Sequence, residues 1–142
     1  MEKCEFCAII AGDAPASLVW EDSLALAFMD IRPVNPGHVL VVPRQHAATL
    51  AQLDPEVGAH LFGVAMRLAP AVRRSGVVSE GINLFLADGR AAGQEVMHVH
   101  LHIVPRFSGD GFGFRIGPLN FQRPDRATLD GIAEGILAAL GG

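Results

Sequence analysis

The strongest constraint on this chain is the segment 98–102, where histidine alternates with aliphatic residues as His-Val-His-Leu-His. In an extended strand successive side chains point to opposite faces. The three histidines would then line one face, with Val99 and Leu101 on the other. Apolar residues continue the segment, which predicts a strand over 96–104.

A row of imidazoles suits catalysis, because imidazole titrates near neutral pH and can act as a nucleophile or as a carrier of protons. The chain has six histidines and half of them lie in this segment. That concentration favours a catalytic row. The alternative is a surface strand whose polar residues face water.

Composition predicts one folded domain over residues 1–142, since 50% of the residues are apolar and 18% are charged. The net charge of -4 excludes the basic surface that long nucleic acids require. A locally basic pocket for a small phosphorylated ligand remains compatible with it. The sequence has no apolar run of about 18 residues and no leader-like N-terminus, so we expect a cytoplasmic protein that does not enter a membrane.

Apolar periodicity and turn residues divide the chain into alternating elements. Asp54 is placed to cap a long helix, with Pro55 at its first position. Close spacing of the strands favours an antiparallel sheet with helices to one side, an α+β fold. The expected helices cover residues 5–11, 54–74 and 128–140, and the expected strands cover 18–21, 24–30, 38–43, 81–87 and 96–104.

Both cysteines lie in one Cys-x-x-Cys motif, Cys4 and Cys7. In a reducing compartment such a pair is more often half of a metal site or a redox pair than a disulfide. A redox pair of the thioredoxin type would follow a strand, and no strand precedes this one. Two inert thiols packed into the first helix are the remaining alternative.

Several segments together resemble the histidine triad (HIT) family of nucleotide hydrolases and transferases. The resemblance covers about residues 4–107, and its motifs are specific in combination. They are the triad at 98–104, the segments 28–33 and 36–46, and the loop 92–96.

The resemblance implies a HIT-like fold, with a five-stranded antiparallel sheet, a long helix and short helices. It also implies a homodimer, in which the sheet extends across both subunits. The implied chemistry is attack by a histidine on the α-phosphate of a nucleotide, giving a nucleotidyl-histidine that water hydrolyses.

Carried over to this sequence, the resemblance makes His100 the nucleophile. His102 would contact phosphate and help the leaving group depart. His98 and His38 would sit beside the nucleophile and support its orientation.

A glycine-containing loop is expected to bind phosphate through its backbone N–H groups, because glycine lets a backbone approach closely. The loop residues are Gly93, Gln94, Glu95 and Val96. The alternative for this loop is an ordinary hairpin connection.

The same resemblance gives candidates for the nucleoside. Asp30 matches the carboxylate that accepts hydrogen bonds from ribose hydroxyls, although an acidic residue at a strand end also serves as a turn cap. Phe6, Phe28 and Ile31 resemble the apolar walls around the base, and by composition alone each reads as core.

Some bacterial members of the family hold zinc, and the matching residues here are Cys4, Cys7, His46 and His98. A Cys₂His₂ set suits a closed tetrahedral site, which is structural rather than catalytic. His98 would then be a ligand and could not act as an acid or base.

The chain departs from the family pattern at two positions. Ala87 stands where many members carry an amide side chain that contacts phosphate, and Glu95 stands where the phosphoramidase branch has a serine. An acidic residue pointing inward there would disfavour an anionic leaving group.

The leading prediction is therefore a dimeric HIT hydrolase that releases a purine nucleoside monophosphate. Its substrates would be phosphoramidates, acyl-adenylates or dinucleoside polyphosphates, with structural zinc and no organic cofactor. The alternatives are a dedicated diadenosine polyphosphate hydrolase and a non-catalytic module that binds purine nucleotides.

Overall fold

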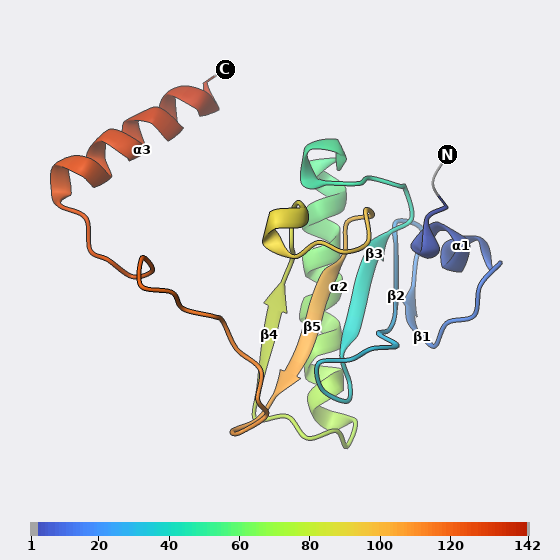
Figure 1. Ribbon diagram of the computed structural model, residues 1–142. Helices are drawn as coiled ribbons and strands as arrows, with labels where there is room; N and C mark the ends of the chain where they lie inside the picture. Colours follow the sequence, from blue (N-terminus) through green and yellow to red (C-terminus); the bar gives the residue numbers. More distant parts are fainter. Residues whose placement is uncertain (1–2, 142) are drawn as a thin grey trace. The chain divides into compact units, whose positions relative to one another are not determined.

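The structure is a computed structural model and describes residues 3–141. The chain divides into two compact units, Met1–Gly111 and Phe112–Gly142 (Figure 1). No helix within the described range is long and apolar enough to span a bilayer. In chain order the helices and strands are α1 (Glu5–Ala11), β1 (Leu18–Glu21), β2 (Ala25–Met29), β3 (Val39–Pro43), α2 (Pro55–Arg74), β4 (Gly81–Phe85), β5 (Leu101–Arg106) and α3 (Arg126–Leu140), with short 3₁₀ turns at Leu50–Gln52 and Arg90–Ala92.

The first unit is built on one five-stranded sheet in the order β1-β2-β3-β5-β4. Each neighbouring pair of strands is antiparallel. β5 lies between β3 and β4, and His102 is in register with Leu40 on one side and Phe85 on the other. The α+β fold with an antiparallel five-stranded sheet is confirmed.

One face of the sheet packs against α2 to form the larger hydrophobic core. Apolar residues at helical spacing turn one side of α2 toward the strands, as the sequence predicted. The core includes Leu61, Val64, Ala65, Leu68 and Val72 of α2 and Val39, Val41, Leu101 and Ile103 of the sheet.

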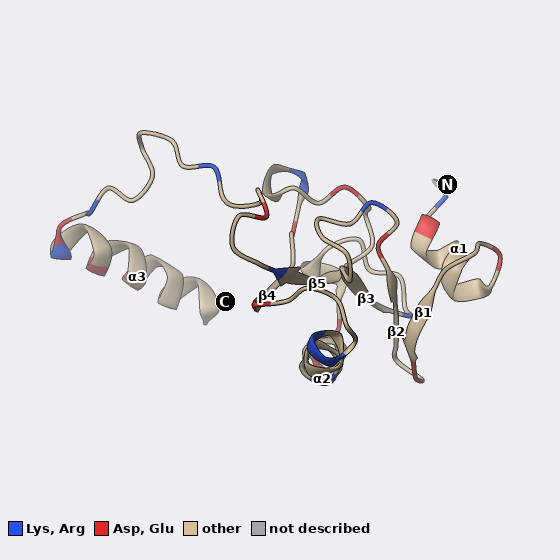
Figure 2. Ribbon diagram, turned by 90° about the horizontal axis from the view of Figure 1, so that it is seen from below, with Lys and Arg blue, Asp and Glu red and all other residues tan. Residues whose placement is uncertain are grey.

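The opposite face of the sheet carries α1 and a smaller core. Phe6 of α1 packs there against Leu26, Phe28, Leu40 and Val42. Because successive strand residues face opposite ways, Leu40 and Val42 belong to this core while their neighbours face α2. Figure 2 shows α2 below the strands and α1 on the other side. Within this unit, the expectation of helices to one side of the sheet was therefore wrong for α1.

The ends of the helices follow the capping residues in the sequence. Asp54 accepts a hydrogen bond from the Glu56 N–H (2.9 Å), and Pro55 is the first residue of α2, as predicted. Cys4 caps α1, because its sulfur accepts a hydrogen bond from the Cys7 N–H. Gly12 ends that helix with φ of 82°, a conformation that glycine adopts without strain.

The strand predicted over 96–104 begins later than expected, at Leu101. Two backbone groups upstream of it are used outside any ladder. The Val99 N–H donates to the Ala47 carbonyl (2.8 Å), and the His98 carbonyl accepts from the His100 ring (2.7 Å). The strands predicted over 24–30, 38–43 and 81–87 are shorter by one or two residues.

The second unit contains α3, which begins at Arg126 and not at residue 128 as predicted. Asp125 caps it by accepting a hydrogen bond from the Thr128 N–H (2.8 Å). The apolar residues of α3, from Leu129 to Leu140, are exposed.

Candidate active site and metal centre

His100 lies just before β5, on the face of the sheet that carries α1. Its side chain is buried with 7% exposed, and the edge of the Phe6 ring packs against it at 5.2 Å between ring centroids. Its Nδ1 lies 2.7 Å from the His98 carbonyl oxygen. A carbonyl can only accept, so in the neutral ring Nδ1 carries the proton and Nε2 keeps its lone pair. The backbone thus selects the tautomer of His100 in which Nε2 can act as a nucleophile.

The ring of His98 points toward the two cysteines and the Pro43 carbonyl. Its Nε2 donates to the Pro43 carbonyl oxygen (2.8 Å), which leaves the lone pair on Nδ1. The side chain is fully buried, and this burial lowers its pKa from the ordinary value. His98 is therefore neutral, with Nδ1 directed toward the two cysteines.

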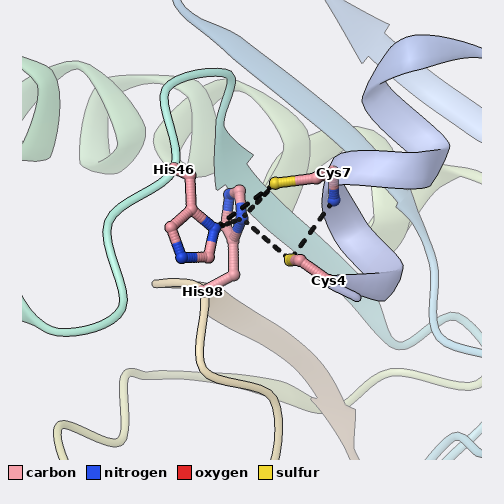
Figure 3. A group of neighbouring side chains, drawn as sticks. All are labelled: Cys4, Cys7, His46 and His98. Atoms are coloured by element: carbon pink, nitrogen blue, oxygen red, sulfur yellow. Dashed lines mark hydrogen bonds between the residues drawn. The ribbon is translucent and has the colours of Figure 1, made fainter. Parts of the chain in front are cut away.

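Four donor atoms meet beside α1, those of Cys4, Cys7, His46 and His98 (Figure 3). The two histidine Nδ1 atoms are 3.2 Å apart. The sulfur–nitrogen separations are 3.4 Å for Cys4 and His98, 3.3 Å for Cys7 and His46, and 3.6 Å for Cys7 and His98.

These separations fit a tetrahedral zinc ion. Zinc held at about 2.0–2.1 Å by nitrogen and about 2.3 Å by sulfur keeps its ligand atoms about 3.3–3.8 Å apart. The hydrogen bond from His98 Nε2 to a carbonyl is also the outer contact that orients a metal-binding imidazole. All four residues predicted from the resemblance are thus brought together.

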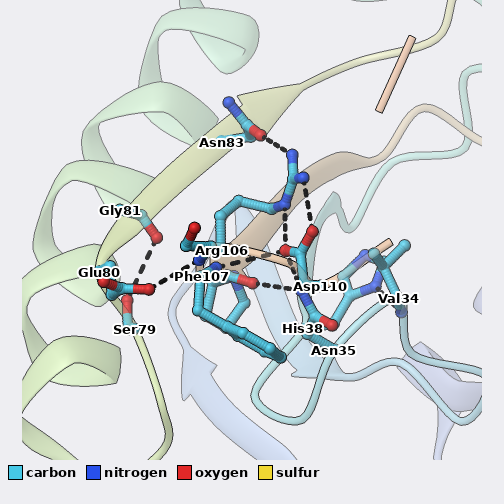
Figure 4. A network of polar contacts seen from close by, with 12 residues as sticks. Val34, Asn35, His38, Ser79, Glu80, Gly81, Asn83, Arg106, Phe107 and Asp110 are labelled. Atoms are coloured by element: carbon cyan, nitrogen blue, oxygen red, sulfur yellow. Dashed lines mark hydrogen bonds and ion pairs between the residues drawn. The ribbon is translucent and has the colours of Figure 1, made fainter. Parts of the chain in front are cut away.

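A second cluster contains Asp30, His38 and His102, and its hydrogen bonds exclude metal binding there. The Val34 N–H donates to His38 Nδ1 (3.1 Å), so the proton of neutral His38 is on Nε2 (Figure 4). That Nε2 lies 2.9 Å from His102 Nδ1 and 3.6 Å from an Asp30 carboxylate oxygen. Since His38 Nε2 has no lone pair to offer, this cluster does not fit a metal.

The chain of hydrogen bonds sets the tautomer of His102. His38 donates to His102 Nδ1, so neutral His102 carries its proton on Nε2. Burial, with His100 and His38 nearby, lowers the pKa of His102 to about 3. Burial also lowers the pKa of His38, against the opposing effect of the Asp30 carboxylate. Both rings are therefore neutral at pH 7, and His102 presents an N–H donor.

The sequence predicts that His38 and His98 support the orientation of His100, and the structure brings both residues to this site. His98 contacts the His100 ring through its backbone carbonyl. The ring of His38 hydrogen-bonds to His102. Phe85 of β4, which sequence reasoning missed, stacks on His102 with ring centroids 4.1 Å apart. Alternation along β4 could have placed Phe85 on this face, but nothing in the sequence marks Val34, which acts through its backbone N–H.

The family model of the HIT domain matches residues 11–109 of the chain. The chain belongs to the HIT family. A relative in Schizosaccharomyces pombe, described as adenosine 5'-monophosphoramidase hnt1, is 37% identical over 115 residues and covers 81% of this chain and 82% of its own.

Two solved structures share the HIT fold over nearly the full chain. The crystal structure of a HIT family protein from Bacillus anthracis has a TM-score of 0.87 and 37% identity, and covers 97% of each chain. That of a Zn-bound histidine triad family protein from Mycobacterium smegmatis has a TM-score of 0.74 and 43% identity, and covers 97% of this chain and 95% of that one.

In this HIT protein the loop predicted to bind phosphate has fewer available donors than the sequence suggested. The N–H groups of Gly93 and Gln94 already donate to Arg90 and Gly89. The buried Gln94 side chain bonds to three backbone groups of Ala48, Gly89 and Val96. Among residues 3–141, the N–H groups of Glu95 and Val96 make no such bond.

Glu95 stands at the rim of the site. Its side chain is 83% exposed and pairs with Arg32 at 3.8 Å. A pocket of about 330 Å³ opens beside the candidate metal site, between α1 and this loop. Its lining includes Lys3, Cys4, His46, Arg90, Glu95 and Val96.

The candidates for the nucleoside differ in how far a ligand could reach them. Phe6 and Phe28 are 6% and 3% exposed and pack edge to face, so they are chiefly core. Ile31 is 91% exposed. Asp30 caps a turn by accepting from the Arg32 N–H (2.8 Å), while its second carboxylate oxygen faces His38.

Proposed function

We propose that this HIT protein is a nucleotide hydrolase that acts through a nucleotidyl-histidine intermediate on His100. The observation that carries the proposal is the hydrogen bond from His100 Nδ1 to the His98 carbonyl, which leaves Nε2 free to attack. The phosphoramidase description of the Schizosaccharomyces pombe relative supports the reaction class.

In the first step His100 Nε2 attacks the α-phosphorus, and the bond from phosphorus to the leaving group breaks. The leaving group keeps that electron pair and takes a proton from water. The Nε2–H of His102 donates a hydrogen bond to the departing atom, which stabilises the charge that develops there. The N–H groups of Glu95 and Val96 donate hydrogen bonds to the non-bridging phosphate oxygens. The Asp30 carboxylate accepts hydrogen bonds from the ribose hydroxyls.

In the second step water attacks the phosphorus and the bond between phosphorus and His100 Nε2 breaks. The products are a nucleoside monophosphate and free His100, and the proton released by water passes to solvent. Dividing one difficult displacement into two lowers the barrier for each.

We also propose that Cys4, Cys7, His46 and His98 hold a structural zinc ion. The zinc supplies no step of the reaction. It would cross-link α1 to the segments before α2 and before β5, because its four ligands come from those three places.

We also propose that the bound nucleotide has a purine base and that the protein forms a homodimer with a continuous sheet. Both come from the resemblance to the family, and β1 and β4 are the two edge strands from which a sheet could extend.

The test is release of AMP from adenosine phosphoramidate and from diadenosine tetraphosphate, offered in parallel. Replacing a covalent nucleophile costs on the order of 10⁴-fold or more in kcat, so His100→Asn should abolish turnover. His60→Asn is the matched control, since His60 is bonded to Asp22 on the face of the sheet that carries α2.

The ratio of the two rates identifies the substrate class, and a preference for diadenosine tetraphosphate would favour a dedicated polyphosphate hydrolase. If wild-type protein binds AMP but releases none from either compound, the chain is a nucleotide-binding module and the proposal is wrong.

A further inference from the structure

The loop between β2 and β3 carries both Val34 and His38, and one buried amide fixes it in place. Asn35 is 6% exposed. Its Nδ2 donates to the Pro105 carbonyl (2.8 Å). The same Nδ2 donates to an Asp110 carboxylate oxygen (2.9 Å), and Figure 4 shows these two side chains facing each other. Its own carbonyl accepts from the His38 N–H (3.2 Å).

Close packing at Gly37 also holds this loop. Gly37 has φ of 96°, and a Cβ there would lie 3.0 Å from Val77 and 3.1 Å from Pro105. A larger residue at position 37 would have a strained backbone conformation, and its Cβ would crowd Val77 and Pro105. The loop therefore rests directly on the end of β5.

Asp110, the second partner of Asn35, is itself held by a strong ion pair. Its side chain is 3% exposed, and Arg106 binds it with two hydrogen bonds, of 2.6 and 2.9 Å. Bidentate pairing of this kind fixes a carboxylate in one orientation. Arg106 also donates to Asn83 on the neighbouring strand β4 (2.6 Å).

These contacts form a continuous path from the Asp110 carboxylate to the active site. Asp110 holds Asn35, Asn35 follows Val34 in the chain, and the Val34 N–H donates to His38 Nδ1. His38 in turn donates to His102 Nδ1. The position of one backbone N–H thus decides which nitrogen of His102 carries the proton.

We propose that Asn35, held by Asp110, is a positioning residue that fixes His102 in the Nε2–H tautomer needed to hydrogen-bond the leaving group. This rests on the proposed function for its effect on the rate, but its effect on the tautomer is independent of any substrate.

The first experiment measures the tautomers directly. Long-range ¹H–¹⁵N correlation spectra of zinc-loaded protein with ¹⁵N-labelled histidine distinguish Nδ1–H from Nε2–H in neutral rings. The signals of His38 and His102 are identified from their loss in His38→Asn and His102→Asn. We expect Nε2–H for both. A wild-type spectrum with His102 protonated on Nδ1 would overturn the proposal.

The second experiment compares variants of the path. In Asn35→Ala we expect mixed tautomers at His102 and a kcat lower by roughly 10- to 100-fold with little change in KM, as for other residues that orient a proton-carrying group. Asn83→Ala is the matched control: it removes a hydrogen bond to the Arg106–Asp110 ion pair from the side of β4 but touches neither the loop nor His38, so tautomers and kcat should stay as in wild type.

Val34→Pro serves as the second variant, because proline has no N–H to donate while Asn35 keeps its partners. It should reproduce the altered tautomer of His102, with folding verified by thermal denaturation. If Asn35→Ala or a folded Val34→Pro retains the wild-type tautomers and kcat, Asn35 is only a structural anchor. If the wild-type tautomers are as expected but no nucleotide is hydrolysed, the proposed function fails while the positioning stands.

Discussion

Asp22 gathers hydrogen bonds from two side chains and two backbone groups. Trp20 Nε1 and His60 Nε2 each donate to one carboxylate oxygen at 2.7 Å. The N–H groups of Leu24 and Ala25 each donate to the other at 2.8 Å. Burial alone would raise the pKa of Asp22, but these bonds outweigh it and hold the pKa well below its usual range.

A lowered carboxylate pKa makes stability depend on pH in a defined direction. Asp22 stabilises the fold fully above its unfolded pKa of about 3.9, and this contribution is lost as the pH falls further. Asp22→Asn should therefore lower the free energy of unfolding by about 1.5–3 kcal/mol at pH 7. The difference from wild type should shrink below about pH 4.

Urea unfolding followed by tryptophan fluorescence measures this directly, because Trp20 is the single tryptophan and is bonded to Asp22. Asp130→Asn, at an exposed position of α3, is the control. Equal pH dependence in wild type and Asp22→Asn would contradict the prediction.

The histidines show why residue identity alone did not settle their roles. The sequence, with its family resemblance, predicted a set of histidines that the structure brings close together. The proton positions depend on groups distant in the chain: the Pro43 carbonyl for His98 and the Val34 N–H for His38. The same residue type therefore offers a lone pair to a candidate metal site in one place and donates a hydrogen bond in the other.

At the scale of elements, the two faces of α2 give a clear contrast between neighbouring residues. Leu61 is 1% exposed in the larger core, whereas Phe62 is 51% exposed. Leu61→Ala should cost about 2–5 kcal/mol in the free energy of unfolding, because it removes buried methyl groups and leaves a cavity. Phe62→Ala, the matched control, should change it by less than about 0.5 kcal/mol. Similar losses in both variants, measured by urea unfolding, would mean that the burial of α2 is not as described.

The elements were predictable where their signals are local. The periodicity and caps that define α1 and α2 lie within those helices, and their bounds were predicted to within one residue. The strand predicted over 96–104 was wrong at its N-terminal end, because β3 pairs with β5 only from Leu101 onward. The preceding His98 carbonyl is taken by the His100 side chain, an interaction that strand propensity does not register.

At the scale of the whole molecule, the proposed zinc would connect stability to the active site. His98 provides Nδ1 to the metal cluster and its carbonyl to His100, so both depend on one residue. Removing zinc should lower the free energy of unfolding, by about 4 kcal/mol relative to protein in free zinc at roughly 1,000 times its Kd. Activity should fall as well, since the carbonyl that orients the nucleophile loses its anchor.

Zinc retention should also depend on pH. Burial, with Cys4 close by, raises the pKa of the Cys7 thiol in the metal-free protein. Zinc binds the thiolate, so it must displace this proton, and acid favours the protonated, metal-free state. Metal analysis after dialysis at decreasing pH should show loss of zinc as the pH falls, with a lower melting temperature in the same samples.

The matched pair for this prediction is His46→Asn and His60→Asn. The first removes a ligand that is exposed at the surface, and the second makes the same change away from the cluster. We expect His46→Asn to lose zinc, melt at lower temperature and turn over more slowly, and His60→Asn to retain zinc and activity. If His46→Asn lost its zinc but kept both the wild-type melting temperature and the wild-type rate, the cluster would be a binding site without influence on the fold, and His100 would be oriented without it.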